Sequence, residues 1–258
     1  MRHWVRAVWW GLFVLAATFL LLGDYQYYRL KKAFAPVREA AGSDEAFVVG
    51  AAAHVHERHR RFSKSPRAKT DNPDSAAYRY PLTLLDGGGG CSQRSALLVA
   101  VLQASGIPAR KLLIGLTEDF AHHVVVEALV EGEWRVLDPL FGYAYRRESG
   151  ELATAEDLKA RPELVERIVR ADPDPFPIPY RLEAFNYRAV TRFNWFRLPM
   201  TRAIRAQVGP AADSWATPAI WERPFGLPSL VFALLLIPAT WVYLRIRTTA
   251  AAASRDVV

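Results

Sequence analysis

The fold of this chain is decided by the stretch GGGGCSQRSALLVAVLQASGIPAR, residues 87–110. The glycine run ends at Cys91, the only cysteine of the chain, and the apolar run after it has the length of a helix that stops at Gly106. A thiol at a helix N-terminus faces unpaired backbone N–H groups and the positive end of the helix dipole, and both favour the thiolate. Cys91 is therefore a candidate nucleophile, although a lone cysteine is more often a small buried apolar residue.

Three strand-like segments follow the predicted helix, at residues 107–115, 122–130 and 134–138, and the last two are spaced as a hairpin. The second segment carries His122 and His123, and the third ends at Asp138. One cysteine with histidine and aspartate elsewhere in the chain is typical of nucleophilic enzymes. The two histidines point to opposite strand faces, and an aspartate at a strand end is by itself an ordinary turn residue.

The order and spacing of these segments resemble the core of the transglutaminase-like superfamily of papain-like cysteine enzymes. The similarity covers about residues 44–141, which is under half of the chain. The residues that carry it are Cys91 opening the helix, Gly-Ile-Pro-Ala-Arg at 106–110, His123 with Glu127, and Trp134 shortly before Asp138 and Pro139.

The resemblance implies an α+β, papain-like fold in which the helix bearing Cys91 packs on an antiparallel sheet. It implies Cys91 as nucleophile, His123 rather than His122 as general base, and Asp138 as the group that orients the imidazole, with no cofactor or metal. Glu127 is then expected to be a partnered polar residue and Trp134 a core ring.

The chemistry implied is acyl transfer through a thioester, which water resolves in a peptidase or amidase and an amine resolves in a cross-linking enzyme. The backbone N–H of Cys91 is one expected oxyanion donor, and Tyr78 or Tyr80 is a candidate for the second. The alternative is a catalytically inactive transglutaminase-like module that binds a partner within an envelope assembly.

Two uncharged apolar runs, residues 7–23 and 224–244, have the length that about 30 Å of hydrocarbon requires of a helix. A cleaved signal peptide is the alternative for the first run, but no small-x-small cleavage site follows it. A buried core helix is the alternative for the second run, and its length argues against that. We therefore expect two transmembrane helices and a membrane-bound protein.

The basic residues near these runs predict which side of the membrane the loop occupies. Arg2 and Arg6 precede the first run, and Arg245 and Arg247 follow the second, which favours cytoplasmic termini. Basic residues at the start of the loop count against this, but long loops translocate largely regardless of charge. We expect a multi-pass protein of the inner (cell) membrane with an extracytoplasmic catalytic domain. A lone cysteine forms no internal disulfide, so cysteine usage leaves the compartment open.

The predicted organisation has five parts. They are a transmembrane helix at 1–23, a catalytic domain at 24–150 with its core at about 44–141, a basic, aromatic-rich extension at 151–223, a second transmembrane helix at 224–245 and a tail at 246–258. A proline-rich linker at 172–179 lies within the extension, and a helix is expected at 154–169.

The predicted partners are membrane lipid and an amide substrate, namely a protein, a peptide or an envelope polymer. The formal net charge is +7, and arginines alternate with aromatic residues between 180 and 208. Next to a membrane span, this pattern favours an interfacial role or an ordinary packed extension, and nucleic acid is disfavoured.

Two further motifs point away from other functions. A helix expected at 43–62, with Ser43 as its cap, carries His54, His56 and His59, but only the last two share a face and no fourth ligand is apparent, so zinc is disfavoured. The glycine run lacks the Gly-Lys-Ser/Thr ending of a phosphate-binding loop, so nucleotide binding is also disfavoured.

The topology is testable with a reporter fused to the C-terminus. We expect signal from a reporter that is active only in the cytoplasm and none from one that is active only in the periplasm, because Arg245 and Arg247 follow the second span. A periplasmic signal at this end would contradict the predicted orientation.

Overall fold

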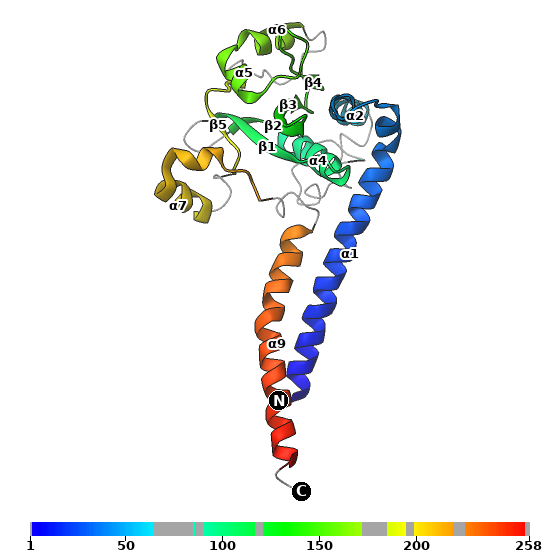
Figure 1. The fold of residues 1–258 in the computed structure, drawn as a ribbon, viewed down its shortest axis with the longest axis vertical. Helices are drawn as coiled ribbons and strands as arrows, with labels where there is room; N and C mark the ends of the chain where they lie inside the picture. Colours follow the sequence, from blue (N-terminus) through cyan, green and yellow to red (C-terminus); the bar gives the residue numbers. More distant parts are fainter. Residues whose placement is uncertain are drawn as a thin grey trace. The chain divides into compact units, whose positions relative to one another are not determined.

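The structure is a computed structural model that describes residues 2–63, 85, 90–116, 121–171, 185–194, 199–218 and 225–255 (Figure 1). Its contacts divide the chain into two compact units, Met1–Gln26 with Arg223–Val258, and Tyr27–Glu222. The predicted linker at 172–179, the candidate oxyanion donors Tyr78 and Tyr80, and glycines 87–89 lie outside the described residues.

The first unit contains α9 (Gly226–Arg255) and the part of α1 (Arg2–Ala40) that ends at Gln26, and these two helical segments run alongside each other (Figure 1). Both are long and apolar enough to cross a membrane, over Trp4–Ala40 and Gly226–Thr248. Trp9 connects them, because its Nε1 donates to Thr240 Oγ1 at 2.8 Å and its ring stacks on Tyr243 at 5.7 Å. The two predicted helices of membrane-spanning length are therefore confirmed.

Helix α1 extends well beyond residue 23, where the apolar run ends. The next residues are charged and polar but contain neither glycine nor proline before Pro36, so the helix continues as it leaves the apolar segment. Leu30 and Phe34, on this continuation, are buried in the core of the second unit.

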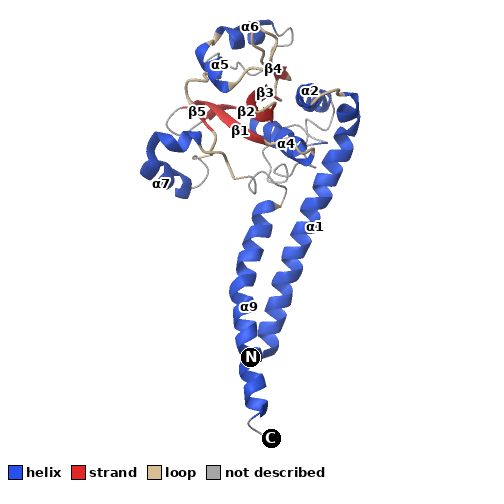
Figure 2. Ribbon diagram, viewed as in Figure 1, coloured by secondary structure: helices blue, strands red, loops and turns tan. Residues whose placement is uncertain are grey.

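The second unit contains one antiparallel sheet of five strands in the order β4-β3-β2-β1-β5 (Figure 2). The strands are β1 (Ala109–Leu116), β2 (Ala121–Val130), β3 (Glu133–Asp138), β4 (Tyr143–Ala144) and β5 (Val190–Thr191). The helices are α2 (Asp44–Ser63), α4 (Cys91–Ala104), α5 (Ala155–Ala160), α6 (Glu163–Ala171) and α7 (Pro199–Val208), with a 3-10 helix η4 (Gly209–Ser214).

Alternation along the strands gives the sheet two different cores. Val126 and Ala128 face one side, where α4 and α2 pack against them. Val125 lies in a second cluster with residues of α5, α6 and the segment 185–187. Figure 2 shows α4 lying along β1 and β2. The α+β prediction, with the Cys91 helix packed on an antiparallel sheet, is confirmed.

The ends of the helices follow local chemistry. Ser43 Oγ accepts the N–H of Ala46 at 3.1 Å and caps α2, as predicted. Helix α4 ends before Gly106, whose φ of +83° lets the N–H of Ile107 return to the carbonyl of Leu102 at 2.9 Å.

The predicted hairpin is present, because Glu131 and Gly132 both have positive φ, the conformation of a two-residue type I′ turn between β2 and β3. The single helix predicted at 154–169 is wrong. Two helices, α5 and α6, replace it, and the break falls at Arg161 and Pro162, since proline disfavours helical backbone in the residue before it.

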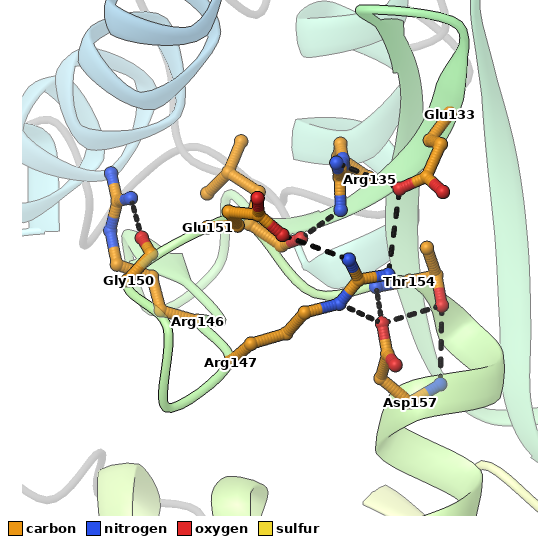
Figure 3. Close-up of polar contacts among 9 residues, drawn as sticks. Glu133, Arg135, Arg146, Arg147, Gly150, Glu151, Thr154 and Asp157 are labelled. Atoms are coloured by element: carbon orange, nitrogen blue, oxygen red, sulfur yellow. Dashed lines mark hydrogen bonds and ion pairs between the residues drawn. The ribbon is translucent and has the colours of Figure 1, made fainter.

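A cluster of polar side chains holds the chain after β4 against β3 (Figure 3). Arg147 contacts Asp157 at 2.7 Å, Glu151 at 3.0 Å and Glu133 at 3.5 Å. Arg135 contacts the same Glu133 at 2.7 Å. One arginine thus ties β3, the turn and the first residues of α5 together.

Thr154 closes a capping box with Asp157 at the start of α5. We expect Thr154→Ala to lower the free energy of unfolding by about 1 kcal/mol, because it leaves a backbone N–H without its acceptor. Thr154→Ser keeps the hydroxyl and serves as the control. Thermal unfolding of the detergent-solubilised protein measures both variants, and equal destabilisation of the two would show that the cap is not the cause.

Candidate functional site

The centre of the site is a hydrogen bond between His123 on β2 and Asp138 at the end of β3. His123 Nε2 lies 2.6 Å from Asp138 Oδ2, and both side chains are 0% exposed. A carboxylate only accepts, so Nε2 carries the proton and Nδ1 is the nitrogen left for another group. His122, the residue that precedes His123 on the strand, is exposed.

Four donors surround the Asp138 carboxylate. The N–H groups of Leu140 and Phe141 donate to Oδ1 at 2.9 and 3.3 Å. The Tyr145 hydroxyl and the imidazole share Oδ2, with the hydroxyl at 3.4 Å. These hydrogen bonds fix the direction of the carboxylate.

Cys91 is the first residue of α4 and is half-buried. Burial alone would lower the pKa of His123, but the charge and hydrogen bond of Asp138, followed by those of Cys91, raise it to about 9. The thiol therefore lies near enough to the imidazole to influence its pKa. The structure brings Cys91, His123 and Asp138 together.

Two residues on the first turns of α4 fix the position of Cys91. Arg94 is buried and its Nη1 donates to the carbonyl of Leu140 at 2.8 Å, two residues after Asp138. Ser95 Oγ donates to the carbonyl of Val124 at 2.9 Å, one residue after His123. The end of the helix that carries the thiol is therefore attached to both strands of the His–Asp pair.

Two histidines of α2 lie next to residues of the site. His56 Nδ1 lies 2.7 Å from the same Leu140 carbonyl, which accepts only, so His56 donates there. Its ring packs against Gly142, whose φ is +72° and where a Cβ would come within 3.1 Å of the ring. Burial and the charges of Arg94 and His56 lower the pKa of His59 to about 3.

Within the described ranges, no group of three His, Cys, Asp or Glu residues is arranged to hold a metal ion.

Three residues of the motif form a group of their own on β1, β2 and β3. Glu127 is 1% exposed and accepts from Arg110 Nε at 2.7 Å, and the Arg110 guanidinium lies 3.8 Å from the centre of the Trp134 ring. Glu127 is thus a partnered polar residue, as expected. Trp134 is half-exposed and stacks on the arginine, so its prediction as a core ring is wrong.

Sequence reasoning missed several residues around the pair. Arg94 and Ser95 carry a signal, because residues three and four positions after Cys91 lie on the same face of the helix as Cys91. Tyr145 and Phe185 carry none, since their contacts with Asp138 and His123 depend on how distant segments fold.

Comparison with known proteins finds a similarity for part of this chain. The family model described as Transglutaminase-like superfamily matches residues 37–139. A crystal structure of a candidate protease from Parabacteroides distasonis ATCC 8503 matches with 21% identity and a TM-score of 0.31. That match covers 47% of this chain and 26% of the other, and a likeness of this extent carries no argument about function. No curated protein matches the chain.

The raised pKa of His123 predicts how stability depends on pH. The folded state holds the proton up to about pH 9, whereas an unfolded histidine releases it near 6.5. The stabilisation is therefore complete below pH 6.5 and is lost as pH rises through 9. We expect the melting temperature to fall across this window, and less so in His123→Gln.

This comparison is best made in a Cys91→Ser background, because an ordinary cysteine thiol ionises at about pH 8.5, within the same window. His59, with its pKa lowered to about 3, acts in a separate window below pH 6.5. Melting curves with the same pH dependence with and without His123 would contradict the expectation.

Proposed function

Because residues 37–139 form a transglutaminase-like domain, we propose that this protein is a cysteine enzyme that forms a thioester with the acyl part of an amide substrate. The observation that carries the proposal is the buried His123–Asp138 pair with the Cys91 thiol acting on its imidazole. A nucleophile, a proton carrier and a group that orients the carrier are the parts that thiol-based acyl transfer needs.

In the proposed first half-reaction, the Cys91 thiolate attacks the amide carbonyl carbon, and a C–S bond forms as the carbonyl π electrons move to oxygen. The N–H of Cys91 is the proposed oxyanion donor, since the first N–H groups of a helix have no intrahelical acceptor. The imidazolium of His123 gives the proton on Nδ1 to the nitrogen of the substrate. The C–N bond breaks, ammonia or an amine leaves, and a thioester remains.

In the proposed second half-reaction, water or an amine attacks the thioester and gives a proton to His123. The C–S bond breaks, the acyl product leaves, and the thiolate–imidazolium pair is restored. Asp138 keeps its orientation through both halves, because two backbone N–H groups and a hydroxyl donate to it in addition to the imidazole. Its role is to hold the ring in one orientation and to stabilise its charged form.

The helices α1 and α9 support a membrane location for this activity. We propose that the protein resides in the cell membrane with its catalytic domain on the extracytoplasmic side. Tethering then limits the substrate to amides near the membrane surface, such as peptides, membrane proteins or amide-bearing envelope polymers.

The decisive experiment measures the alkylation of Cys91 by iodoacetamide in the purified full-length protein. Cys91 is the only cysteine, so the rate reports one site. We expect wild type to react at pH 6 at least about tenfold faster than His123→Ala, because the imidazolium holds the sulfur as thiolate below the pH of about 8.5 at which an ordinary thiol ionises.

His122→Ala is the matched control, since it removes the neighbouring imidazole, which is exposed, and should leave the rate unchanged. Equal rates for wild type and His123→Ala would refute the proposed activation. That result would favour the alternative of an inactive module that binds a partner.

A further inference from the structure

The segment 185–194 lies outside the matched domain, yet it is built into the same sheet. Its strand β5 pairs with β1, so that Val190 is opposite Ile114, and Ile114 is in turn opposite His123 on β2. The N–H groups of Gly115 and Leu116 donate to carbonyls of this segment at 3.2 and 3.4 Å. An extension that follows the family's domain therefore reaches the strand next to the proposed catalytic histidine.

Two aromatic rings of this segment cover the His–Asp pair. Phe185 is 5% exposed, and its ring meets the His123 imidazole edge-on, with 5.1 Å between ring centres. Tyr187 is 3% exposed and meets Tyr145 edge-on at 6.1 Å, and the Tyr145 hydroxyl donates to Asp138. The ring centre of Phe141 lies 5.7 Å from that of the imidazole and 5.6 Å from that of Phe185. The phenyl rings of Phe141 and Phe185, which come from distant segments of the chain, therefore both pack near the histidine.

A bidentate ion pair attaches the segment to β2. Arg192 Nε and Nη2 lie 2.8 and 2.9 Å from the two oxygens of Glu127, which is 1% exposed. Glu127 lies on the same face of β2 as His123, because it is four positions further along the strand. Two parallel hydrogen bonds from a planar guanidinium to a buried carboxylate fix both the distance and the direction of the contact. The pair therefore sets where the segment lies along β2.

We propose that the segment 185–194 is a working part of the active site, in which Phe185 positions the His123 imidazole and Arg192 fastens the segment to the sheet through Glu127. The inference rests on the proposed function and adds two positioning residues that lie beyond the matched domain. Neither residue touches the substrate, and both act through His123.

The physical reason is exclusion of water and restriction of the ring. A hydrogen bond between charged groups is stronger where water is excluded, so covering the pair strengthens the hold of Asp138 on the imidazole. The edge of the Phe185 ring also limits rotation of the imidazole about its χ2 angle, which keeps Nδ1 directed at the thiol.

The raised pKa of His123 agrees with this picture. Titratable or charged groups that act on the pair come from several elements of the described chain. Cys91 on α4 acts on the imidazole, and Tyr145 after β4 and Tyr187 in the segment itself interact with Asp138. Burial raises the pKa values of both tyrosines well above 10. Tyr187 and Asp138 raise that of Tyr145 further, and Asp138 raises that of Tyr187, so neither tyrosine titrates in the range of the experiment.

The test compares Arg192→Gln with Arg110→Gln in the full-length protein. Both arginines pair with Glu127 and both are mostly buried, but only Arg192 belongs to the segment. The readout is the pH at which the rate of Cys91 alkylation by iodoacetamide is half-maximal. Loss of overall stability does not move this midpoint pH.

We expect Arg192→Gln to raise this midpoint by about one unit towards the value of about 8.5 of an ordinary thiol, because an imidazolium that is less firmly held stabilises the thiolate less. Below the midpoint, this shift is about a tenfold fall in rate. Arg110→Gln should stay at the wild-type midpoint.

Phe185→Leu and Phe185→Ala provide a second comparison that leaves every charge in place. Leucine keeps an apolar cover over the imidazole and should retain most of the wild-type midpoint, whereas alanine should shift it as Arg192→Gln does. If Arg192→Gln does not fold, the comparison of the two Phe185 variants tests the proposed role of the segment by itself.

The inference is overturned if wild type shows activation by His123 but Arg192→Gln and Arg110→Gln have the same midpoint, or if both Phe185 variants match wild type. The proposed function fails in a different way, namely when wild type and His123→Ala alkylate at the same rate. The two failures are therefore distinguishable in one set of measurements.

Discussion

The hydrogen bond between His123 and Asp138 depends on complete burial, and much of the surrounding structure serves to make that burial tolerable. Removing an ionised carboxylate from water costs several kcal/mol unless donors replace the lost hydration. Here two backbone N–H groups, a tyrosine hydroxyl and the imidazole supply those donors. Because the turn after β3 provides the N–H groups, its backbone course is part of the site.

The Leu140 carbonyl links this turn to the helices. It accepts from Arg94 on α4 and from His56 on α2. The turn therefore supports the Asp138 carboxylate through its N–H groups and holds the Cys91 helix through its carbonyl. A shift of α4 along the sheet would break bonds on the turn and on β2 together, so the spacing between the thiol and the imidazole is determined from two directions.

The sequence was sufficient for whatever depends on local pattern. The glycine that ends α4, the cap of α2 and the hairpin between β2 and β3 are set by neighbouring residues, and each lies where the pattern predicts. The break at Pro162 also has a local signal, but the apolar spacing of the same segment fits one longer helix, so the two signals conflict. The Cys91, His123 and Asp138 positions came from the motif and not from any measure of distance.

The rest of the site depends on contacts between segments that are far apart in the chain. The Arg192–Glu127 pair joins residues that are 65 positions apart. Arg192 is mostly buried, whereas the sequence of a basic, aromatic-rich segment predicts one more surface charge. Phe185 likewise looks like an ordinary aromatic residue near a proline-rich stretch. Only the pairing of β5 with β1 shows which side chains the extension brings to the histidine.

The turn between β2 and β3 has a consequence for the order of folding. His123 and Asp138 are 15 residues apart and are joined by a two-residue turn, so closing the loop between them costs little chain entropy. Hairpins of this kind form within microseconds, whereas Phe185 and Arg192 leave the ribosome several seconds after Asp138 at about 5–20 residues per second. During synthesis, the hairpin that carries His123 and Asp138 therefore forms before Phe185 and Arg192 are available. The nascent chain passes through a stage in which the pair is formed but still exposed to water.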